Sequence, residues 1–315
     1  MLLSITDLTK VYRGGVSAND GVSLSVEEGQ VFGLLGHNGA GKTTLVNQVI
    51  GLLAPTGGSI QIDGRDAVAD PAYARRACSI QPQAQVPLNG LTPRQAVELV
   101  GQLRGGSPAR VRERTARFVE ALDIGEWLDR GGEKLSAGVK RLTSFCMAAV
   151  APGRVVILDE PTNDVDPVRR RLLWGQVRVL ADEGAAVLLV THNVLEAERA
   201  VDRLAILDHG RVIAEGTPAE LKAGIAEDLR LELVLEPGAE LVSFPPFVHR
   251  TVPRGSRVIA SIGPDDAGAA VLWASQLRRG GRIEEFGLVP ATLEDVYVQL
   301  VGKADVREAT DGHAA

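Results

Sequence analysis

The chain has 315 residues, of which 45% are hydrophobic and 23% are charged. This composition is ordinary for a folded globular protein and too apolar for a disordered one. The 34 basic and 40 acidic side chains give a formal net charge of −6. That balance disfavours a nucleic-acid partner, because proteins that bind nucleic acids usually carry a basic face. At about 150 residues per domain, the length predicts two domains.

The apolar runs are too short for a membrane span. The longest, at 147–152 and 185–190, fall far below the ~18 residues that a spanning helix requires. The start of the chain lacks the basic and apolar segments of a signal peptide. Its two cysteines, Cys78 and Cys146, are too few for a disulfide scaffold, so we expect two buried thiols in a reducing cytosol. A role at a membrane therefore requires a partner.

Up to about residue 225, strand-like apolar runs alternate with helical segments. This alternation predicts an α/β fold with a mostly parallel sheet. The stretch 84–150 carries no strand signal and is expected to form an inserted helical subdomain. Helices opened by a capping residue and a proline are expected at 94–103, 109–122 and 168–182, after Thr92, Ser107 and Asp166. Strands are expected at 2–5, 22–26, 31–35, 59–62, 155–158, 186–190 and 203–207.

The pattern changes near residue 226, where leucines alternating with charged residues predict a strand at 229–233. We therefore expect a first domain at 1–225, a small α+β domain at 226–302 and a polar tail at 303–315. The small domain is near the lower size limit for independent stability. After a proline-rich link at 244–253, its expected elements are a strand at 258–262, a helix at 265–279, a strand at 282–289 and a helix at 293–301.

A glycine-rich segment follows the strand at 31–35 and fits the phosphate-binding pattern G-x-x-x-x-G-K-[ST]. Its glycines let successive backbone N–H groups face a phosphate, and the helix expected at 43–52 adds partial positive charge. Lys42 is placed to reach the β- and γ-phosphates of a nucleotide, and the Thr43 hydroxyl to ligate Mg²⁺. The predicted nucleotide-binding residues are Gly36, Asn38, Gly39, Ala40, Gly41, Lys42, Thr43 and Thr44.

The buried strand expected at 155–158 is followed by two carboxylates. Asp159, at the strand end, is suited to hold Mg²⁺ directly or through water. Glu160 is suited to polarise the water that attacks a γ-phosphate. Together with the phosphate-binding segment, this acidic pair predicts a site that hydrolyses a nucleotide.

Four further motifs occur along the chain together with the phosphate-binding segment and the acidic pair. With both nucleotide motifs, their order closely resembles the nucleotide-binding domain of ATP-binding cassette (ABC) proteins over residues 1–225. The resemblance implies a P-loop α/β fold with an inserted helical subdomain, and ATP and Mg²⁺ as cofactors. The additional motifs are Ile80-Gln81-Pro82-Gln83, Leu135-Ser136-Ala137-Gly138-Val139, Pro161-Thr162-Asn163-Asp164-Val165-Asp166 and Leu188-Leu189-Val190-Thr191-His192.

The resemblance also implies roles for residues near the nucleotide. Tyr12 corresponds to the aromatic residue that stacks on adenine. Gln83, which follows a proline as in the family pattern, corresponds to the glutamine that senses Mg²⁺ and the attacking water, and it is preferred over Gln81. His192 corresponds to the switch histidine that contacts the γ-phosphate. The implied catalytic residues are Glu160, His192, Gln83 and Lys42, and the implied metal ligands are Thr43, Gln83 and Asp159.

Three more positions imply a second subunit. Ser136 and Gly138 correspond to the signature loop that contacts the γ-phosphate held by the opposite subunit, and Asp166 to the loop that crosses between subunits. A complete site then takes Lys42 and Glu160 from one chain and Ser136 from another. We therefore expect a head-to-tail homodimer around two ATP molecules.

The signature loop departs from the usual family pattern, Leu-Ser-Gly-Gly-Gln. Ala137 stands in place of the first glycine and Val139 in place of the glutamine. A methyl group at position 137 blocks a backbone conformation open only to glycine, or is harmless if the residue is helical. If the methyl group does block that conformation, we expect the Ala137→Gly replacement to raise the ATPase rate.

The segment 290–302 resembles the C-terminal tail of ATP-binding subunits in type-2 ABC exporters of drugs, antibiotics and polysaccharides, such as the daunorubicin-resistance type. Its apolar residues share one helical face, which is expected to pack on its own domain or on a second subunit. The resemblance implies an exporter ATPase at the cytoplasmic face of the cell membrane. Separate transmembrane permease subunits are expected to dock on the insert around 83–99.

Two other functions stay open at this point. One is a non-hydrolytic or regulatory ATP-binding module, which the altered signature loop supports and Glu160 with His192 opposes. The other is a soluble ABC ATPase acting on ribosomes or DNA, although no second cassette, coiled coil or zinc module is evident. The basic run 169–171 fits a helix face paired with acidic residues better than a nucleic-acid contact. His209, His249 and His313 have no motif around them and are expected to be structural or solvated.

Overall fold

The computed structural model describes residues 1–223, 229–239, 243–290, 292–298 and 300. It divides into two compact units, Met1–Pro218 and Ala219–Ala315. The domain boundary expected near residue 225 and the tail expected at 303–315 lie outside the described residues. Within the described part of the chain, no helix combines the length and the apolar character needed to cross a membrane.

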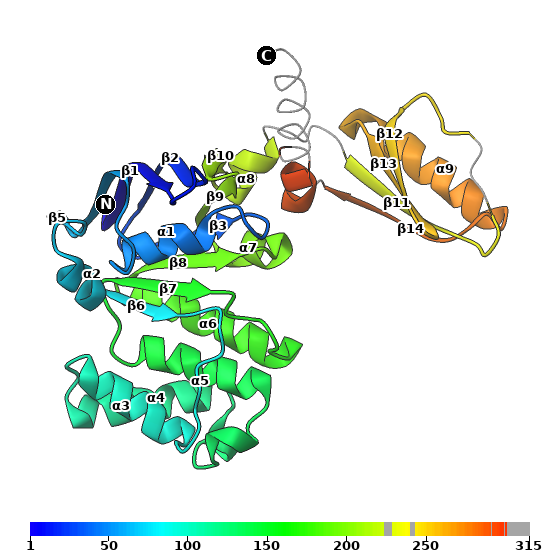
Figure 1. Ribbon diagram of the computed structural model, residues 1–315. Coiled ribbons are helices and arrows are strands. Elements are labelled where there is room, and N and C mark those ends of the chain that lie inside the picture. The colour runs from blue at the N-terminus through cyan, green and yellow to red at the C-terminus, as the bar shows by residue number, and fades with distance from the viewer. Residues whose placement is uncertain (224–228, 240–242, 291, 299, 301–315) are drawn as a thin grey trace. The chain divides into compact units, whose positions relative to one another are not determined.

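The first unit is built on a six-stranded sheet in the order β10-β9-β3-β8-β7-β6 (Figure 1). All neighbours pair in parallel except β10, which runs antiparallel to β9. The strands β3, β7 and β8 are buried along their whole length, as expected for parallel strands covered on both faces. The bounds are β3 Val31–Leu35, β6 Cys78–Gln81, β7 Val155–Asp159, β8 Ala186–Thr191, β9 Arg203–Asp208 and β10 Arg211–Gly216.

A second, antiparallel sheet has the order β2-β1-β4-β5. One apolar core joins it to the larger sheet and to α1, since buried residues such as Leu3, Phe32 and Leu45 belong to a single cluster. Helix α1, which follows β3 and the turn after it, is therefore part of this core. The bounds are β1 Leu3–Val11, β2 Ser17–Val26, α1 Lys42–Val49, β4 Gly57–Ile62, β5 Arg65–Asp66 and α2 Pro71–Ala77.

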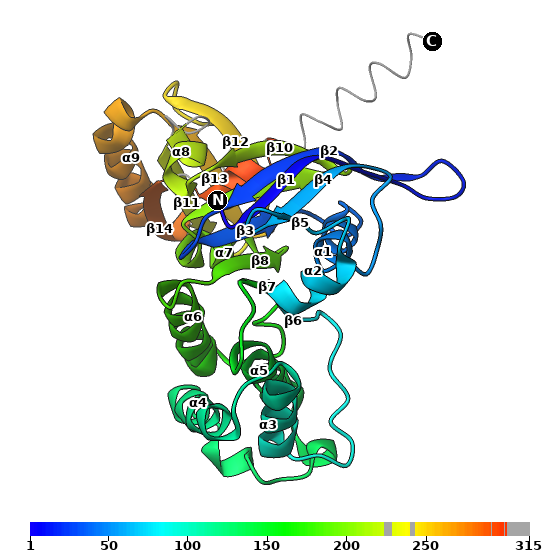
Figure 2. The same cartoon turned by 90° about the vertical axis from the view of Figure 1, so that its left-hand side faces the viewer.

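The expected helical insert is confirmed, with no strand between residues 84 and 150, all of which are described (Figure 2). Two of its helices begin as predicted, because the side chains of Thr92 and Ser107 accept hydrogen bonds from the backbone N–H groups of Gln95 and Arg110. The insert contains α3 Pro93–Leu103, α4 Pro108–Ala121 and α5 Ala137–Ala149, with short 3-10 turns at Gly125–Trp127 and Gly132–Lys134.

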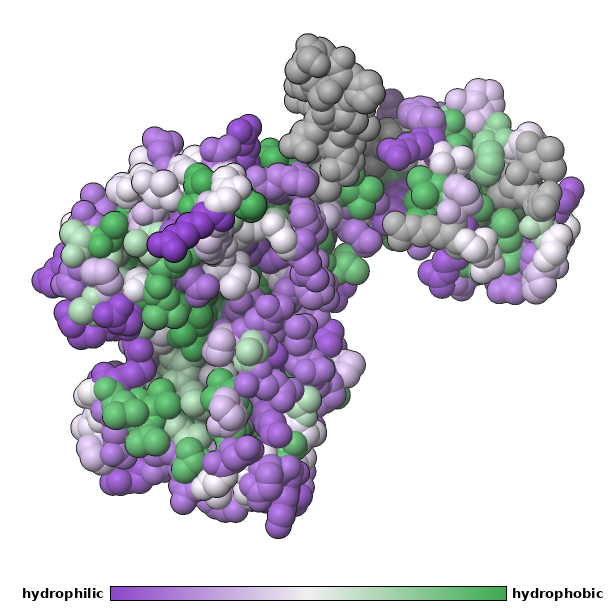
Figure 3. Space-filling view, in the orientation of Figure 1, coloured by the Kyte–Doolittle hydropathy of each residue, from purple (hydrophilic) through white to green (hydrophobic). Residues whose placement is uncertain are grey.

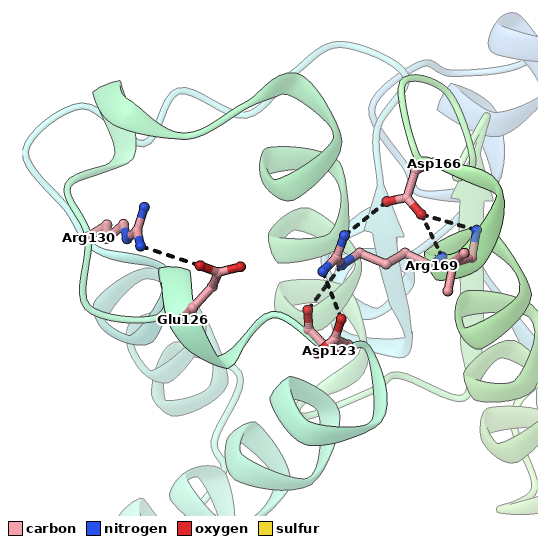
Figure 4. A network of polar contacts seen from close by, with 6 residues as sticks. Asp123, Glu126, Arg130, Asp166 and Arg169 are labelled. Atoms are coloured by element: carbon pink, nitrogen blue, oxygen red, sulfur yellow. Dashed lines mark hydrogen bonds and ion pairs between the residues drawn. The ribbon is translucent and has the colours of Figure 1, made fainter.

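Arg169 is one of several arginines that link the insert to the body of the unit (Figure 4). Arg169 lies on α6, which spans Pro167–Asp182. Its Nη2 is 2.7 Å from Asp123 Oδ2, just after α4, and its Nη1 is 3.2 Å from Asp166 Oδ2, at the start of α6. Arg170 Nη1 pairs with Glu196 Oε1 at 2.7 Å. The first two arginines of the basic run are thus paired with acidic residues, as the sequence indicated.

Some elements differ from the sequence-based expectation. Helix α1 ends at Val49 and not at residue 52. The short strand β6 and the edge strand β10 were not predicted, nor were α2, α7 at Val194–Ala200 and α8 at Pro218–Ala223. Each of these elements is short, and periodicity over so few residues carries little information.

The second unit has an antiparallel sheet in the order β12-β13-β11-β14. Helix α9 packs on it through the buried Ala270 and Ala274. The prediction of a link at 244–253 was wrong for its second half, because β12 includes Pro253. Proline is tolerated there because β12 is an edge strand. The bounds are β11 Leu229–Leu235, β12 Val248–Arg254, β13 Arg257–Ile262, α9 Ala267–Arg279 and β14 Ile283–Pro290.

A last helical segment covers residues 293–298, while residues 299 and 301 of the expected helix lie outside the described part. Thr292 and Asp295 cap its start: the Asp295 N–H donates to Thr292 Oγ1 at 3.4 Å, and the Thr292 N–H to Asp295 Oδ2 at 2.9 Å. Arg230 Nη1 on β11 lies 3.1 Å from Asp295 Oδ1. An ion pair within its own unit therefore holds this segment.

Candidate nucleotide-binding site

The phosphate-binding segment forms the turn between β3 and α1, where the sequence placed it. Gly41 has φ 103, and a Cβ atom there would lie 2.2 Å from the Ala18 carbonyl oxygen, so glycine is required. Lys42 Nζ donates to the carbonyl oxygens of Gly36 at 2.6 Å and His37 at 3.0 Å. Burial lowers the pKa of Lys42, although Glu160 and Asp159 act in the opposite direction.

A pocket of about 440 Å³ opens beside this turn. It brings together residues from the phosphate-binding segment, the glutamine before the helical insert and the acidic end of β7. Ala18, on β2, is the one lining residue that was not predicted, since no motif surrounds it. The lining residues are Ala18, Asn38, Gly39, Gly41, Lys42, Thr43, Thr44, Gln83, Asp159 and Glu160. Gly36 and Ala40 are buried behind this lining.

Asp159 ends β7 as a buried carboxylate. Burial raises the pKa of Asp159 to about 6, with a further contribution from Glu160, while Lys42 and Arg141 oppose the rise. Two adjacent buried carboxyl groups thus repel each other on the pocket wall, beside the Thr43 hydroxyl and Gln83. This all-oxygen donor set fits a hard divalent cation such as Mg²⁺, whose charge offsets that repulsion.

Glu160 is held by the end of the neighbouring strand β8. Its Oε1 accepts from the His192 backbone N–H at 2.9 Å and lies 2.6 Å from His192 Nδ1. Its Oε2 accepts from Thr191 Oγ1 at 3.0 Å. Glu160 has φ 50, a left-handed conformation that few residues other than glycine adopt. The parallel pairing of β7 with β8 therefore places the predicted acid and the predicted histidine in contact.

The two candidate glutamines have different surroundings. Gln83 lines the pocket, whereas Gln81 is buried and its Nε2 donates to the Arg141 carbonyl at 3.1 Å. Arg141, on α5, donates in turn to the carbonyl oxygens of Pro82 and Gln83. Sequence reasoning missed Arg141, because nothing in its neighbourhood marks a buried arginine as a partner of this loop.

Tyr12 lies at the edge of the same region. Its hydroxyl is 3.4 Å from Thr44 Oγ1, and the residue is 43% exposed. The Lys10 ammonium sits 5.6 Å from the centre of its ring. An exposed aromatic ring beside the phosphate-binding segment is available to a flat ligand group.

The three residues expected to act on a second subunit's nucleotide do not line this pocket, and neither do Tyr12 and His192 at its edge. Ser136 caps α5 by accepting from the Val139 N–H at 3.3 Å, and Asp166 caps α6 by accepting from Val168 N and Arg169 N. The hydrogen bond from the Arg169 N–H is the largest cause that lowers the pKa of Asp166. Gly138 packs against the loop before α6, because a Cβ atom there would lie 2.5 Å from the Asp164 carbonyl oxygen.

The departures from the usual signature loop have structural explanations. Ala137 is the first residue of α5 and does not need the conformational freedom of glycine. The expectation that Ala137→Gly raises the ATPase rate therefore loses its basis, since glycine weakens a helix. Val139 is buried in an apolar cluster with Leu88, Ala96 and Leu135, so a hydrophobic residue suits this position.

These features define a P-loop ATPase with a helical insert. The ABC transporter family model matches residues 19–163. The chain is 40% identical over 232 residues to the daunorubicin/doxorubicin resistance ATP-binding protein DrrA of Streptomyces peucetius, covering 73% of this chain and 70% of that one. It is 31% identical to the Nod factor export ATP-binding protein I of Ralstonia nicotianae, covering 96% and 94%.

Solved structures agree with this assignment. A structure described as the ATP-binding subunit of an ABC transporter superposes with a TM-score of 0.66 at 29% identity, covering 71% of this chain and 93% of that one. The chain belongs to the family of ATP-binding proteins of ABC transporters. It binds ATP, and its enzyme class is that of the ABC-type transporter ATPases.

Proposed function

We propose that this chain is the ATP-hydrolysing subunit of an ABC exporter, working as a homodimer with separate transmembrane permease subunits at the cytoplasmic face of the membrane. The contact between Glu160 and His192 at the nucleotide pocket carries the proposal. A carboxylate that lines the pocket and is held in place by a histidine is suited to act as a general base, which a purely regulatory ATP-binding module does not need.

Within the pocket, each residue has a distinct task. The N–H groups of the phosphate-binding segment and the ammonium of Lys42 hold the β- and γ-phosphates. Glu160 orients the attacking water and accepts its proton, and His192 positions Glu160 and contacts the γ-phosphate. Tyr12 stacks on the adenine ring. Mg²⁺, held by Thr43, Asp159 and Gln83, would neutralise phosphate charge when bound.

A dimer completes the site. Ser136, Gly138 and Asp166 carry the expected signature and crossing-loop roles, yet none of them lines the pocket of its own chain. Ser136 instead stands at the N-terminus of α5, a helix of 13 residues whose first N–H groups favour an anion. We infer that this end of α5 contacts the γ-phosphate held by a second copy, so that two ATP molecules lie between two chains.

Export through a membrane partner is supported by the relatives and by the surface of the insert. The two relatives described above are named for drug resistance and for Nod factor export. On α3, Leu99 is 48% exposed and Leu103 is 77% exposed. Figure 3 shows apolar surface gathered over this part of the insert. Exposed apolar side chains of this kind suit a protein docking surface.

A Glu160→Gln variant tests the catalytic assignment. We expect ATP to bind as in the wild type, the hydrolysis rate to fall by about 10²- to 10⁴-fold, and a dimer to accumulate with ATP in sedimentation. Glu113→Gln, which neutralises an exposed acid on α4, is the matched control and should hydrolyse ATP at the wild-type rate. Equal rates for Glu160→Gln and wild type would overturn the catalytic role of Glu160.

A capture experiment tests the transporter assignment separately. The Glu160→Gln protein, tagged and trapped with ATP in native membranes, should copurify a polytopic membrane protein in stoichiometric amount. Ribosomal proteins or DNA-repair factors in its place would favour the soluble ATPase. Copurification of no membrane protein, together with normal hydrolysis by the wild type, would overturn the exporter assignment and leave the ATPase assignment standing.

A further inference from the structure

We propose that His37, Asp208 and His209 form a second metal site, specific for a transition-metal dication of the Zn²⁺ type. One ligand atom from each of the three residues lies within 4.8 Å of the others. Two imidazoles and one carboxylate bind Zn²⁺ and Co²⁺ well, whereas Mg²⁺ prefers ligands that are all oxygen atoms. The site is distinct from the ATP site and goes beyond the proposed function.

The geometry already approaches that of a bound ion. His37 Nε2 lies 2.9 Å from Asp208 Oδ1, and His209 Nε2 lies 4.0 Å from the same oxygen. The two imidazole ring centres are 5.6 Å apart. With metal–ligand distances near 2.0–2.2 Å, ligand atoms around one ion stand roughly 3.3 Å apart, so the 4.0 Å separation between His209 and Asp208 has to shorten by less than about 1 Å.

The hydrogen bonds of His37 supply a second reason for a cation. Its Nδ1 lies 2.7 Å from the Asn38 carbonyl oxygen, while its Nε2 faces Asp208 Oδ1. Both partners are acceptors, but a neutral imidazole carries only one N–H. With the hydrogen on Nδ1, the Nε2 lone pair points at a carboxylate oxygen. Either a second proton, which makes an ion pair with Asp208, or a metal ion beside these two atoms removes the repulsion. With a metal ion, the Asn38 carbonyl acts as the outer hydrogen-bond partner that histidine ligands usually have.

The surrounding backbone fixes two of the three ligands. Asp208 is the last residue of β9 and is 2% exposed, so its carboxylate has little freedom. His209 follows in the turn to β10 with φ 44, a conformation rarely adopted by residues with a Cβ atom. The Gly210 N–H donates to the Ala40 carbonyl at 3.0 Å, which ties this turn directly to the phosphate-binding segment.

The site is a neighbour of the nucleotide pocket and not a part of it. None of its three residues lines that pocket, whose metal donors are oxygen atoms. His37, however, belongs to the phosphate-binding turn, and its carbonyl oxygen accepts from Lys42 Nζ. A bound ion therefore cross-links the phosphate-binding turn to the end of β9, two segments 171 positions apart in the chain.

Titration of untagged, full-length protein with Zn²⁺ and Co²⁺ in excess Mg²⁺ tests the proposal. We expect one ion per chain by calorimetry, and visible Co²⁺ absorption typical of a low-coordinate nitrogen and oxygen site. His37→Gln and His209→Gln should each weaken binding by at least about tenfold. His192→Gln is the matched control, because His192 is another exposed histidine beside a carboxylate, and it should bind like the wild type.

Thermal melting separates loss of a ligand from loss of the fold. Zn²⁺ should raise the Tm of the wild type and of His192→Gln, and it should leave the Tm of His37→Gln unchanged. Failure of the wild type to bind, equal binding by His37→Gln, or loss of binding in His192→Gln overturns the proposal. None of these outcomes alters the test of the ATPase, which rests on Glu160.

Discussion

The Arg141 guanidinium donates a hydrogen bond to the backbone carbonyl of Gln83, with Nη2 and the oxygen 2.7 Å apart. A second bond, from Nη1 to the Pro82 carbonyl, is 2.8 Å long. Arg141 lies on α5, which Ser136 caps at its N-terminus, while Gln83 lines the nucleotide pocket. The helix that presents the signature loop thus also holds the backbone of the pocket glutamine.

We expect Arg141→Lys to lower the ATPase kcat by about 10- to 100-fold with little change in the KM for ATP. Lysine keeps the charge but cannot reach both carbonyls with a planar fork, so Gln83 loses its fixed position. Steady-state kinetics check this. Lys140→Met, at the neighbouring position on α5, is the control and should keep the wild-type kcat. An unchanged kcat in Arg141→Lys would show that the loop is positioned by other contacts.

Gly138→Ala should reduce ATP hydrolysis by at least about tenfold, because its Cβ atom would meet the Asp164 carbonyl oxygen at 2.5 Å and displace the loop before α6. Gly175 offers a matched control, since a Cβ atom there meets nothing within 4 Å and the residue is inside α6. Gly175→Ala should keep full activity and a slightly higher Tm. Equal activity in the two variants would contradict the steric argument.

Asp159→Asn should stabilise the nucleotide-free protein at pH 8. The pKa of Asp159 is raised from 3.8 to about 6 in the fold, so folding favours the protonated form. The charge therefore destabilises the fold above pH 6, and this penalty shrinks as the pH falls towards 3.8. We expect a gain of about 1–3 kcal/mol at pH 8 and a smaller gain at pH 5.

Thermal melts of wild type and Asp159→Asn at the two pH values measure this difference. The variant should also hydrolyse ATP far more slowly, because it lacks the carboxylate assigned to Mg²⁺. A lower Tm for the variant at pH 8 would mean that the Asp159 charge is stabilised in the fold, contrary to the shift described above.

Both cysteines should resist thiol reagents in the native protein. Burial raises the pKa of the Cys78 thiol and that of the Cys146 thiol to about 12, so almost no thiolate is present at pH 8. Both are buried, as the sequence predicted. A disulfide-exchange colour assay should detect no rapid reaction in buffer and two thiols per chain in denaturant. Rapid native labelling would indicate that one of these sites opens readily.

Sequence patterns were sufficient wherever one short segment carried the whole signal. The proline-marked starts of α3, α4 and α6 are local, because a side chain caps an N–H group only two or three positions away. The phosphate-binding turn is equally local, since its glycines and Lys42 are contiguous. The helical insert was recognised in a different way, from the absence of strand signals over residues 84–150.

Contacts set by sheet register were beyond the sequence pattern. Glu160 and His192 were each predicted, but their direct bond depends on the pairing of Asp159 with Val190 in β7 and β8. The bond from Arg141 to Gln83 joins residues 58 positions apart and has no local signature. His209 was expected to be structural or solvated, since only the three-dimensional fold shows that His37 lies beside Asp208 and His209.

The contact between Arg169 and Asp123 is one of several ion pairs at the joint between the insert and the body of the first unit, beside those of Arg114 and Arg117 with Glu183. Asp123 is 73% exposed, and an exposed pair of this kind contributes about 0.2–1 kcal/mol, which is comparable to thermal energy at 25 °C. A contact of that strength breaks and re-forms readily and does not by itself lock the insert in place. Raised ionic strength should weaken these exposed ion pairs further, so we expect the mobility of the insert to increase with salt concentration.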